Sequence, residues 1–200
     1  MSTVSEATGK EHIREEALKR RDAIPEEVRA IKSLEIKERL LSLEQYRQST
    51  SILLFCSFRT EVDTIPIIKA ALEDEKRVVL PRVNRGLLSL ELYQINSLDD
   101  LTAGYMEILE PVPDKCSQVI PDEMEFVVLP GVAFDLSGGR IGYGGGCYDK
   151  LLGSLHNRPL LTAIAFEEQI MKQVPVEGHD VRVDMIITDR RIIEVAQNEP

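Results

Sequence analysis

A glycine-rich stretch between a buried strand and a short helix constrains this chain more than any other feature. The apolar run 126–129 predicts the strand, and residues 148–152 predict the helix. Six of the chain's twelve glycines lie between residues 138 and 146. Because glycine has no Cβ atom, it allows positive φ angles and close approach of a ligand to the backbone. A loop of this kind at a helix N-terminus gathers backbone N–H groups and partial positive charge, which favours an anion site, most often for phosphate.

The residues beside the glycines favour phosphate binding over a plain tight turn. Arg140 can pair with phosphate through its guanidinium group, and Asp149 can hold a magnesium ion that bridges phosphates. The spacing argues against two common nucleotide motifs. The GxxxxGK[ST] motif of P-loop NTPases is absent from the sequence, and the run from Gly142 to Gly146 has the form GxGxG rather than the GxGxxG of dinucleotide-binding domains.

The same stretch resembles the signature of the 5-formyltetrahydrofolate cyclo-ligase family, also called methenyltetrahydrofolate synthetases. The family pattern is PGxxFD followed by R[LI]GxGxGYYD. It is matched here by Pro130, Gly131, Phe134, Asp135, Arg140, Ile141, Gly142, Gly144, Gly146, Tyr148 and Asp149. Cys147 stands where the first of two tyrosines is usual, and Gly145 stands where some members carry a lysine, so these departures affect the fine shape of the phosphate pocket. The resemblance extends from Lys10 to about Asp184.

The resemblance implies an ATP-dependent ligase that converts 5-formyltetrahydrofolate into 5,10-methenyltetrahydrofolate and releases ADP and phosphate. In the family's chemistry, ATP phosphorylates the formyl oxygen, N10 attacks the activated carbon, and phosphate leaves. Positioning and charge neutralisation supply most of the catalysis in such phosphoryl transfers. This agrees with a sequence in which no Ser/His/Asp or Cys/His arrangement stands out. The implied cofactor is Mg²⁺, with ATP as a co-substrate.

The resemblance also assigns residues to the nucleotide half of the site. Lys10 and Arg14 are four residues apart on one face of a predicted helix and match a pair that contacts ATP. Lys10 and Arg140 are the expected catalytic cations, and Asp149 and Asp180 match acids that the family associates with magnesium. The full expected ATP site comprises Lys10, Arg14, Arg140, Ile141, Gly142, Tyr143, Gly144, Gly145, Gly146, Cys147 and Tyr148. Lys19, Arg20 and Arg21, by contrast, are interpreted as a solvated helix face.

Glu61 is the main candidate on the substrate side. It matches the family acid that holds the pterin, and a carboxylate can accept two donors from a 2-amino-pyrimidinone edge. From the residues alone, Glu61 could instead cap the helix that follows, a role that Asp63 or Thr64 could also fill. The expected substrate-binding set is Cys56, Phe58, Glu61 and Tyr148, of which Phe58 and Tyr148 could equally be core residues.

Apolar runs and helical patterns alternate along the chain. Strands are predicted at 51–56, 77–80, 88–93, 125–129, 160–165 and 184–188, with 192–195 closing a hairpin. Helices are predicted at 10–23, from Pro25 onwards and at 65–72, while 97–121 is expected to be mostly loop. The apolar stripe expected on the helix from Pro25 comprises Val28, Ile31, Leu34, Leu40 and Leu41.

This alternation predicts an α/β fold. We expect one three-layer domain over residues 10–200, with a largely parallel central sheet flanked by helices, an N-terminal helical arm and a disordered segment 1–9. Such sheets bind ligands at the carboxyl ends of their strands. Segments 57–61, 81–85 and 166–168 and the glycine-rich loop all follow predicted strands, so we expect them to meet there.

Charge, hydropathy and cysteine content limit the classes of function that this protein can have. The net charge of −10 opposes nucleic-acid binding, and no apolar run approaches the eighteen residues of a membrane span. The start of the sequence lacks the pattern of a secretory signal, and three cysteines without a CxxC motif favour a reduced cytoplasm. We therefore expect a cytoplasmic enzyme that acts on small molecules, with a monomer as the default state.

Two other classes explain less of the sequence. A phosphate- or nucleotide-binding α/β protein related to sugar-phosphate isomerases or CoA transferases would explain the glycine-rich loop. It would not explain Lys10, Arg14, Glu61 and Asp180 together. A structural interaction protein would explain none of these features.

Overall fold

An eight-stranded mixed sheet forms the centre of the protein. The computed structural model describes residues 3–178 and 180–196. The strand order is β12-β11-β10-β7-β1-β2-β3-β6, and the strands from β2 through β1, β7 and β10 to β11 run parallel. The strands are β1 (Ser51–Leu53), β2 (Arg77–Asn84), β3 (Ser89–Ile95), β6 (Ser117–Val119), β7 (Phe126–Leu129), β10 (Leu160–Ile164), β11 (Met185–Ile187) and β12 (Ile192–Glu194).

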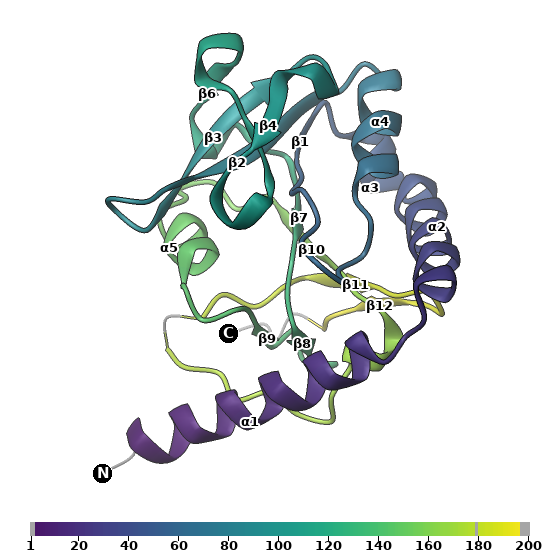
Figure 1. Cartoon of the computed structure of the whole chain (residues 1–200), viewed down its shortest axis with the longest axis vertical. Helices are drawn as coiled ribbons and strands as arrows, with labels where there is room; N and C mark the ends of the chain where they lie inside the picture. Colours follow the sequence, from purple (N-terminus) through teal and green to yellow (C-terminus); the bar gives the residue numbers. More distant parts are fainter. Residues whose placement is uncertain (1–2, 179, 197–200) are drawn as a thin grey trace.

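The strands closest to the centre are short and apolar because both faces of the sheet are covered. Side chains of successive residues point to opposite faces, so Ile52 packs in one core cluster and Leu53 in another. The first cluster includes α2 (Glu26–Ser42) and α4 (Ile65–Glu73), and the second includes α5 (Cys147–Gly153). Figure 1 shows these helices on opposite sides of the sheet. The predicted three-layer α/β class with a largely parallel sheet is therefore confirmed.

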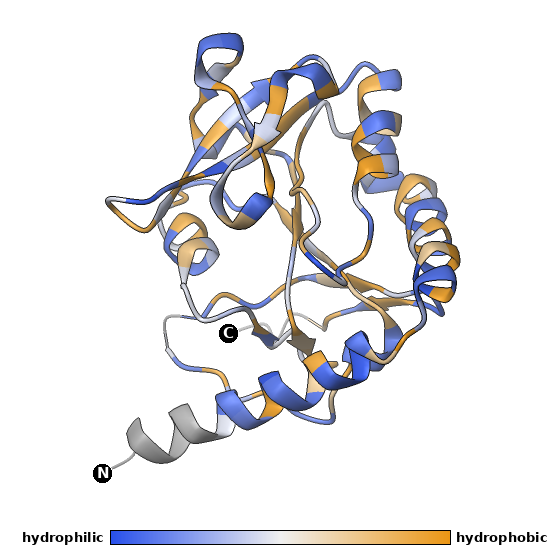
Figure 2. Ribbon diagram, viewed as in Figure 1, coloured by the Kyte–Doolittle hydropathy of each residue, from blue (hydrophilic) through white to orange (hydrophobic). Residues whose placement is uncertain are grey.

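Helix α1 (Thr3–Asp22) forms the predicted N-terminal arm. Figure 1 shows it lying across β8 (Ala133–Phe134) and β9 (Arg140–Ile141), the two strands of a small hairpin. Ala17 is buried there against residues that include Val132 and Met171. Figure 2 shows that α1, where it is coloured by hydropathy, is largely hydrophilic with a few apolar residues. The helix begins at Thr3 rather than at Lys10, and residues 1–2 lie outside the described chain. The disorder expected for residues 1–9 stays a prediction.

Helix α2 is present as predicted, but it buries a different face. Ser33, Ile36 and Leu40 are its buried residues, whereas Ile31 is 60% exposed and Leu34 51% exposed. Val28 is also exposed, and Leu41 is only partly buried, so Leu40 alone of the expected stripe is fully buried. The helix has apolar residues on two faces. The face with Ser33, Ile36 and Leu40 is the buried one, partly because the small Ser33 side chain accepts a hydrogen bond from the backbone N–H of Asp63, 3.1 Å away.

Smaller elements complete the fold. The short helix α3 (Glu44–Gln48) precedes β1, and β12 pairs with β11 as an antiparallel hairpin, as predicted. The segment 97–121 is more ordered than expected, because it contains β6 and the hairpin of β4 (Leu101–Ala103) and β5 (Leu109–Pro111). One-turn 3₁₀ helices lie at Leu98–Asp100, Tyr105–Glu107, Pro113–Lys115, Pro121–Glu123 and Glu167–Gln169. No helix in the described part of the chain is long and apolar enough to cross a membrane.

Candidate active site

The first half of the sequence signature builds the hairpin that presents Arg140. The side chain of Asp135 is buried and accepts hydrogen bonds from the backbone N–H groups of Ser137 and Gly139, both at 2.9 Å, and of Val174 at 2.8 Å. At Gly131, an added Cβ atom would lie 2.3 Å from the ring of Phe134, so only glycine fits there. The close fit and the buried carboxylate fix the β8–β9 hairpin, and with it the start of the glycine-rich loop.

The glycine-rich loop runs from Gly142 to the start of α5. Gly144 has φ +100° and Gly146 has φ +63°, so both adopt backbone conformations that residues with a Cβ atom rarely reach. A Cβ atom built at Gly146 would meet no protein atom within 4 Å. The glycine at this position is thus required by the backbone and by access to the loop, and not by packing within the protein.

The two cations of α1 reach this loop and the segment that follows Pro175. Arg14 donates from Nε to the backbone oxygen of Gly142 at 2.9 Å. Lys10 Nζ lies 2.6 Å from Asp180 and 3.2 Å from Glu177. Burial opposes the charge on Lys10, but hydrogen bonds from it to both carboxylates outweigh burial and raise its pKa. Of the predicted helix-face pair, Arg14 therefore lies at the glycine-rich loop, and Lys10 lies at the segment with Glu177 and Asp180, held in its charged form.

Arg140 pairs with Asp149 across the same loop. Its Nη2 atom lies 2.7 Å from the carboxylate, and the two side chains are only 4% and 22% exposed. The same carboxylate oxygen accepts a 3.4 Å hydrogen bond from the backbone N–H of Val181, the residue after Asp180. The two predicted metal-binding carboxylates therefore belong to adjacent segments, and each is paired with a predicted ATP-binding cation.

Asp149 and Asp180, the two carboxylates predicted to bind magnesium, would be a sparse set of metal ligands. Among the described residues, no three His, Cys, Asp or Glu side chains gather as a metal-binding cluster. Mg²⁺ is commonly held by one or two carboxylates, with water and substrate phosphates completing its oxygen ligands. Asp149 and Asp180 supply donors of that type and number. They fit a magnesium ion that arrives with ATP better than one held by the protein alone.

Glu61 lies in the loop after β1 and is largely desolvated. Burial raises its pKa to about 7, against the opposing effects of a hydrogen bond from the backbone N–H of Phe58, the charge of Arg21 and a hydrogen bond from Tyr143. The bond from Phe58 measures 2.8 Å. The rings of Phe58 and Tyr143 contact each other edge to face with centroids 5.7 Å apart. The expected substrate side thus touches the glycine-rich loop directly through Tyr143.

The alternative role of Glu61 as a helix cap finds no support. The N-cap residue of α4 is Thr64, whose hydroxyl accepts a 2.9 Å bond from the backbone N–H of Ser57. The first-turn N–H of Ile65 is bonded by the carboxylate of Asp63 at 3.0 Å. Because Asp63 serves the helix start, Glu61 is left for another function.

Tyr148 and Cys56 lie between the nucleotide half and the substrate half of the predicted site. The guanidinium carbon of Arg140 is 6.0 Å from the centre of the Tyr148 ring. Burial raises the pKa of Tyr148, with a further contribution from the charge of Glu61. The thiol of Cys56 is buried, which raises its pKa to about 12, so it is neutral and poorly suited to act as a nucleophile. A narrow crevice nearby, with no room for a water molecule, is lined by Phe55, Glu61, Val62, Pro130, Gly131, Ile164 and Gln169.

Comparison with known proteins identifies the family. The model of the 5-formyltetrahydrofolate cyclo-ligase family matches residues 6–189. The chain belongs to this family. A mouse protein named 5-formyltetrahydrofolate cyclo-ligase is 30% identical over 196 residues, which cover 94% of this chain and 97% of the relative. The Escherichia coli K12 protein of the same name is 28% identical over 179 residues, covering 88% and 97%. The family predicted from the loop signature is therefore confirmed.

Solved structures agree with this assignment. An NMR structure of Aquifex aeolicus 5,10-methenyltetrahydrofolate synthetase has a TM-score of 0.84 and 31% identity, and the match covers 96% of this chain and 95% of that one. A Mycoplasma pneumoniae 5,10-methenyltetrahydrofolate synthetase, 20% identical, matches in fold with a TM-score of 0.73. The roles of individual residues in this cyclo-ligase family member stay predictions.

One buried residue at the site contradicts its sequence interpretation. Arg21, expected on a solvated helix face, is 1% exposed. It donates from Nε to Thr60 at 3.0 Å and from Nη2 to the hydroxyl of Tyr143 at 2.8 Å. Its spacing from Arg14 is a signal that could have revealed this, since residues seven apart share one helix face. Arg20 is exposed as expected.

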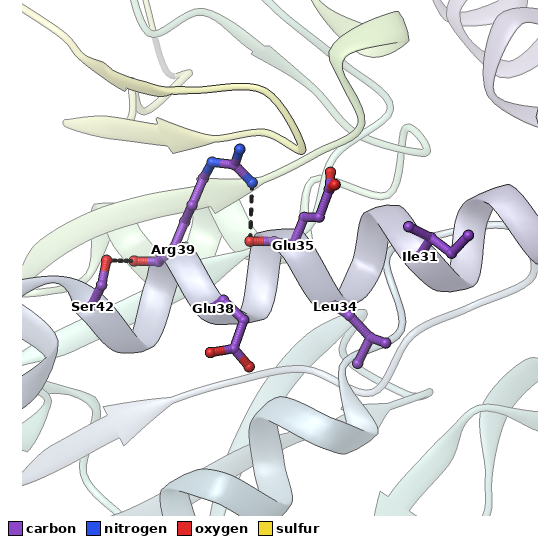
Figure 3. A pocket seen from close by; sticks show the side chains of 6 residues that line it. All are labelled: Ile31, Leu34, Glu35, Glu38, Arg39 and Ser42. Atoms are coloured by element: carbon purple, nitrogen blue, oxygen red, sulfur yellow. Dashed lines mark hydrogen bonds between the residues drawn. The ribbon is translucent and has the colours of Figure 1, made fainter.

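A second pocket lies away from these residues. Figure 3 shows it on the outer surface of α2, where Arg39 donates to the backbone oxygen of Glu35 at 3.1 Å and Ser42 donates to that of Arg39 at 2.7 Å. Its lining consists of Ile31, Leu34, Glu35, Glu38, Arg39 and Ser42. None of these belongs to the predicted site, so this pocket has no part in the site described above.

Proposed function

We propose that this protein catalyses the ATP-dependent cyclisation of 5-formyltetrahydrofolate to 5,10-methenyltetrahydrofolate. Membership of the cyclo-ligase family over residues 6–189 carries the proposal. The geometry supports it, because residues from remote parts of the sequence meet near the glycine-rich loop: Arg14 bonds Gly142, Arg140 pairs with Asp149, and Glu61 interacts with Tyr143. Lys10 pairs with Asp180, whose neighbour Val181 bonds Asp149. In the proposed reaction the formyl oxygen takes the γ-phosphoryl group of ATP and ADP leaves; N10 then attacks the formyl carbon and loses its proton, and phosphate leaves with the formyl oxygen.

The cations neutralise the transferred group in this proposal. Arg140 is almost fully buried, and its Nε atom has no hydrogen-bond partner in the described part of the chain, so one donor remains for a phosphate oxygen. A buried guanidinium interacts more strongly with developing charge than an exposed one, because little water screens it. From α1, Arg14 reaches the glycine-rich loop and Lys10 reaches Asp180, and both would serve mainly to bind the nucleotide.

Asp149 and Asp180 would hold the magnesium ion of Mg-ATP. When bound, the ion would neutralise phosphate charge and orient the γ-phosphoryl group. The chain's own contribution is to place two carboxylates on adjacent segments, linked by the 3.4 Å bond from Val181 to Asp149.

Glu61 would bind the pterin edge of the substrate. An ionised carboxylate accepts two hydrogen bonds side by side, which suits the 2-amino and ring N–H donors of that edge. A carboxyl group with a pKa of about 7 is partly protonated at neutral pH, and the pterin donors would favour its ionised form. Phe58, Cys56 and Tyr148 would line the apolar surface around the substrate.

The formation of the methenyl chromophore tests the proposal. Purified protein mixed with 5-formyltetrahydrofolate and Mg-ATP should develop the near-ultraviolet absorbance of the methenyl product, and omission of ATP should abolish it. If no absorbance develops although the protein binds ATP, the chain is a phosphate binder of the alternative class. The cytoplasmic location and the monomeric state stay predictions from the sequence, and size-exclusion chromatography tests the latter.

A further inference from the structure

We propose that Arg21 is a positioning residue that joins the glycine-rich loop to the substrate loop and thereby orients Glu61 toward the folate. The proposal rests on the function proposed for Glu61 and for the glycine-rich loop. Arg21 comes from α1, Thr60 from the loop after β1, and Tyr143 from the glycine-rich loop. One guanidinium group therefore connects three segments that are remote in the sequence.

The burial of Arg21 indicates that its charge interacts with another group of the site. The side chain is 1% exposed, and Nη1 has no hydrogen-bond partner among the described residues. Its neighbour Asp22 lies 4.0 Å from Nε and is 57% exposed, so water screens that interaction. A buried charge without a close counterion is destabilising. The desolvated carboxyl group of Glu61 is the other charged group of this cluster, and the charge of Arg21 lowers its pKa.

Tyr143 transmits the position of Arg21 to the substrate loop. Its hydroxyl accepts a 2.8 Å bond from Arg21 and donates to Glu61, while its ring contacts the ring of Phe58. Glu61 is thus faced by Arg21 from α1, by Tyr143 from the glycine-rich loop and by Tyr148 from α5. Removal of Arg21 frees Tyr143 and withdraws the cation from Glu61, so both the orientation and the ionisation of the carboxylate change.

Arginine suits this position better than lysine. The guanidinium group holds its donors in a fixed planar fork, so Nε and Nη2 can bond Thr60 and Tyr143 at the same time. A lysine ammonium would retain the charge without the fork. Arg21→Lys should therefore separate the electrostatic effect of Arg21 from its positioning effect.

Steady-state kinetics of four variants test the proposal. Arg21→Gln should raise the folate KM by about tenfold or more, as expected for a poorly oriented buried acceptor. The ATP KM should change by only about twofold or less, because Arg14 holds the entrance of the glycine-rich loop independently. Tyr143→Phe should reproduce part of the folate effect. Arg21→Lys should leave the folate KM raised, and the matched control Arg20→Gln, at an exposed position of the same helix, should behave as wild type.

The pH profile separates positioning from a merely structural role. In Arg21→Gln, the acid limb of kcat/KM for folate should move upward by about one pH unit or more, whereas Arg21→Lys should keep it near its wild-type position. If Arg21 only stabilises the fold, Arg21→Gln should lower the melting temperature. Both KM values and the acid limb of the pH profile should then be unchanged in the folded enzyme. That result would overturn the proposal, and so would a Tyr143→Phe enzyme with wild-type folate KM and pH profile, even if Arg21→Gln failed to fold.

A readout without catalysis keeps this inference distinct from the proposed function. Carboxyl ¹³C NMR of labelled glutamate can follow the titration of Glu61 in the wild type, in Arg20→Gln and in Tyr143→Phe. If the wild type forms no methenyl product, the proposed function fails. The coupling is then judged by the Glu61 titration alone, which should shift in Tyr143→Phe and not in Arg20→Gln, and an unshifted titration would contradict it.

Discussion

Replacing Glu61 with glutamine should stabilise the fold at alkaline pH and weaken folate binding at the same time. The carboxyl group is desolvated, with a pKa of about 7 instead of the ordinary 4.5. Ionised Glu61 is therefore unfavourable in the folded protein, whereas it is well hydrated in the unfolded chain. The glutamine side chain of Glu61→Gln would keep the shape and could still accept the hydrogen bond from the backbone N–H of Phe58.

The size of the effect follows from the two pKa values. Between pH 4.5 and about 7 the folded chain retains the Glu61 proton that the unfolded chain loses, so the stability contributed by this group is complete below pH 4.5 and is lost as pH rises to 7. At about 1.4 kcal/mol per pH unit, the loss is on the order of 3 kcal/mol. Glutamine does not ionise, so Glu61→Gln should not lose this stability. The free energy of unfolding of the variant, relative to wild type, should therefore rise by that amount between pH 4.5 and about 7.

Urea unfolding of the wild type and of Glu61→Gln at pH 5, 6, 7 and 8 measures the difference in their free energies of unfolding. Glu73→Gln, at an exposed position on α4, is the matched control. Folate binding should weaken by roughly ten- to a hundredfold in Glu61→Gln while the ATP KM stays near wild type, because one acceptor and the charge are lost. A stability difference that does not vary with pH would refute the desolvated carboxylate. An unchanged folate KM would remove Glu61 from the site.

Four further substitutions test the nucleotide half. Gly146→Val should abolish ATP use in a folded protein, with a strain of about 1–2 kcal/mol at φ +63°; a normal ATP KM would refute this, and Gly153→Ala is the control. Arg140→Ala should lower kcat/KM for ATP by roughly 10²–10³, whereas Lys10→Ala should mainly raise the ATP KM. Small, equal effects would show that neither cation takes part in ATP binding or catalysis. Asp149→Asn should raise the magnesium concentration for half-maximal rate, and an unchanged magnesium titration would argue against a metal ligand.

The parts of the structure that depend on local sequence were predictable. The strand β7, the glycine-rich loop and α5 follow each other within residues 126–153, and their order is visible as an apolar run, a glycine cluster and a helical pattern. The loop signature also indicated the family. The strand order was not predictable in detail, because β6 joins the sheet edge from a segment whose turn-forming residues suggest a loop.

The remaining differences arise from contacts between distant segments. Lys10 and Asp180 are 170 residues apart, and no local pattern shows that they touch. Helix α2 carries apolar residues on two faces, so only the packing of Ile36 and Leu40 against the sheet decides which one is buried. Arg21 looks like a surface charge until the loop containing Tyr143 covers it. Sequence patterns identify groups with the right chemistry, but tertiary packing determines which of them are desolvated.

The pairing of charges explains how a buried site can be prepared for Mg-ATP. Arg140 is paired with Asp149, and Lys10 with Asp180 and Glu177, so two of the three cations of the predicted phosphate site have anionic partners. A largely buried charge without a partner would destabilise the fold by several kcal/mol. Mg-ATP carries charges of both signs. In the proposed reaction its phosphates would face Arg140 and Lys10 while its metal faces Asp149 and Asp180, so each buried group would exchange one opposite charge for another. Such an exchange requires both signs of charge at the glycine-rich loop. A site built from cations alone could also bind phosphate, but without bound ligand its unpaired cations would destabilise the folded protein.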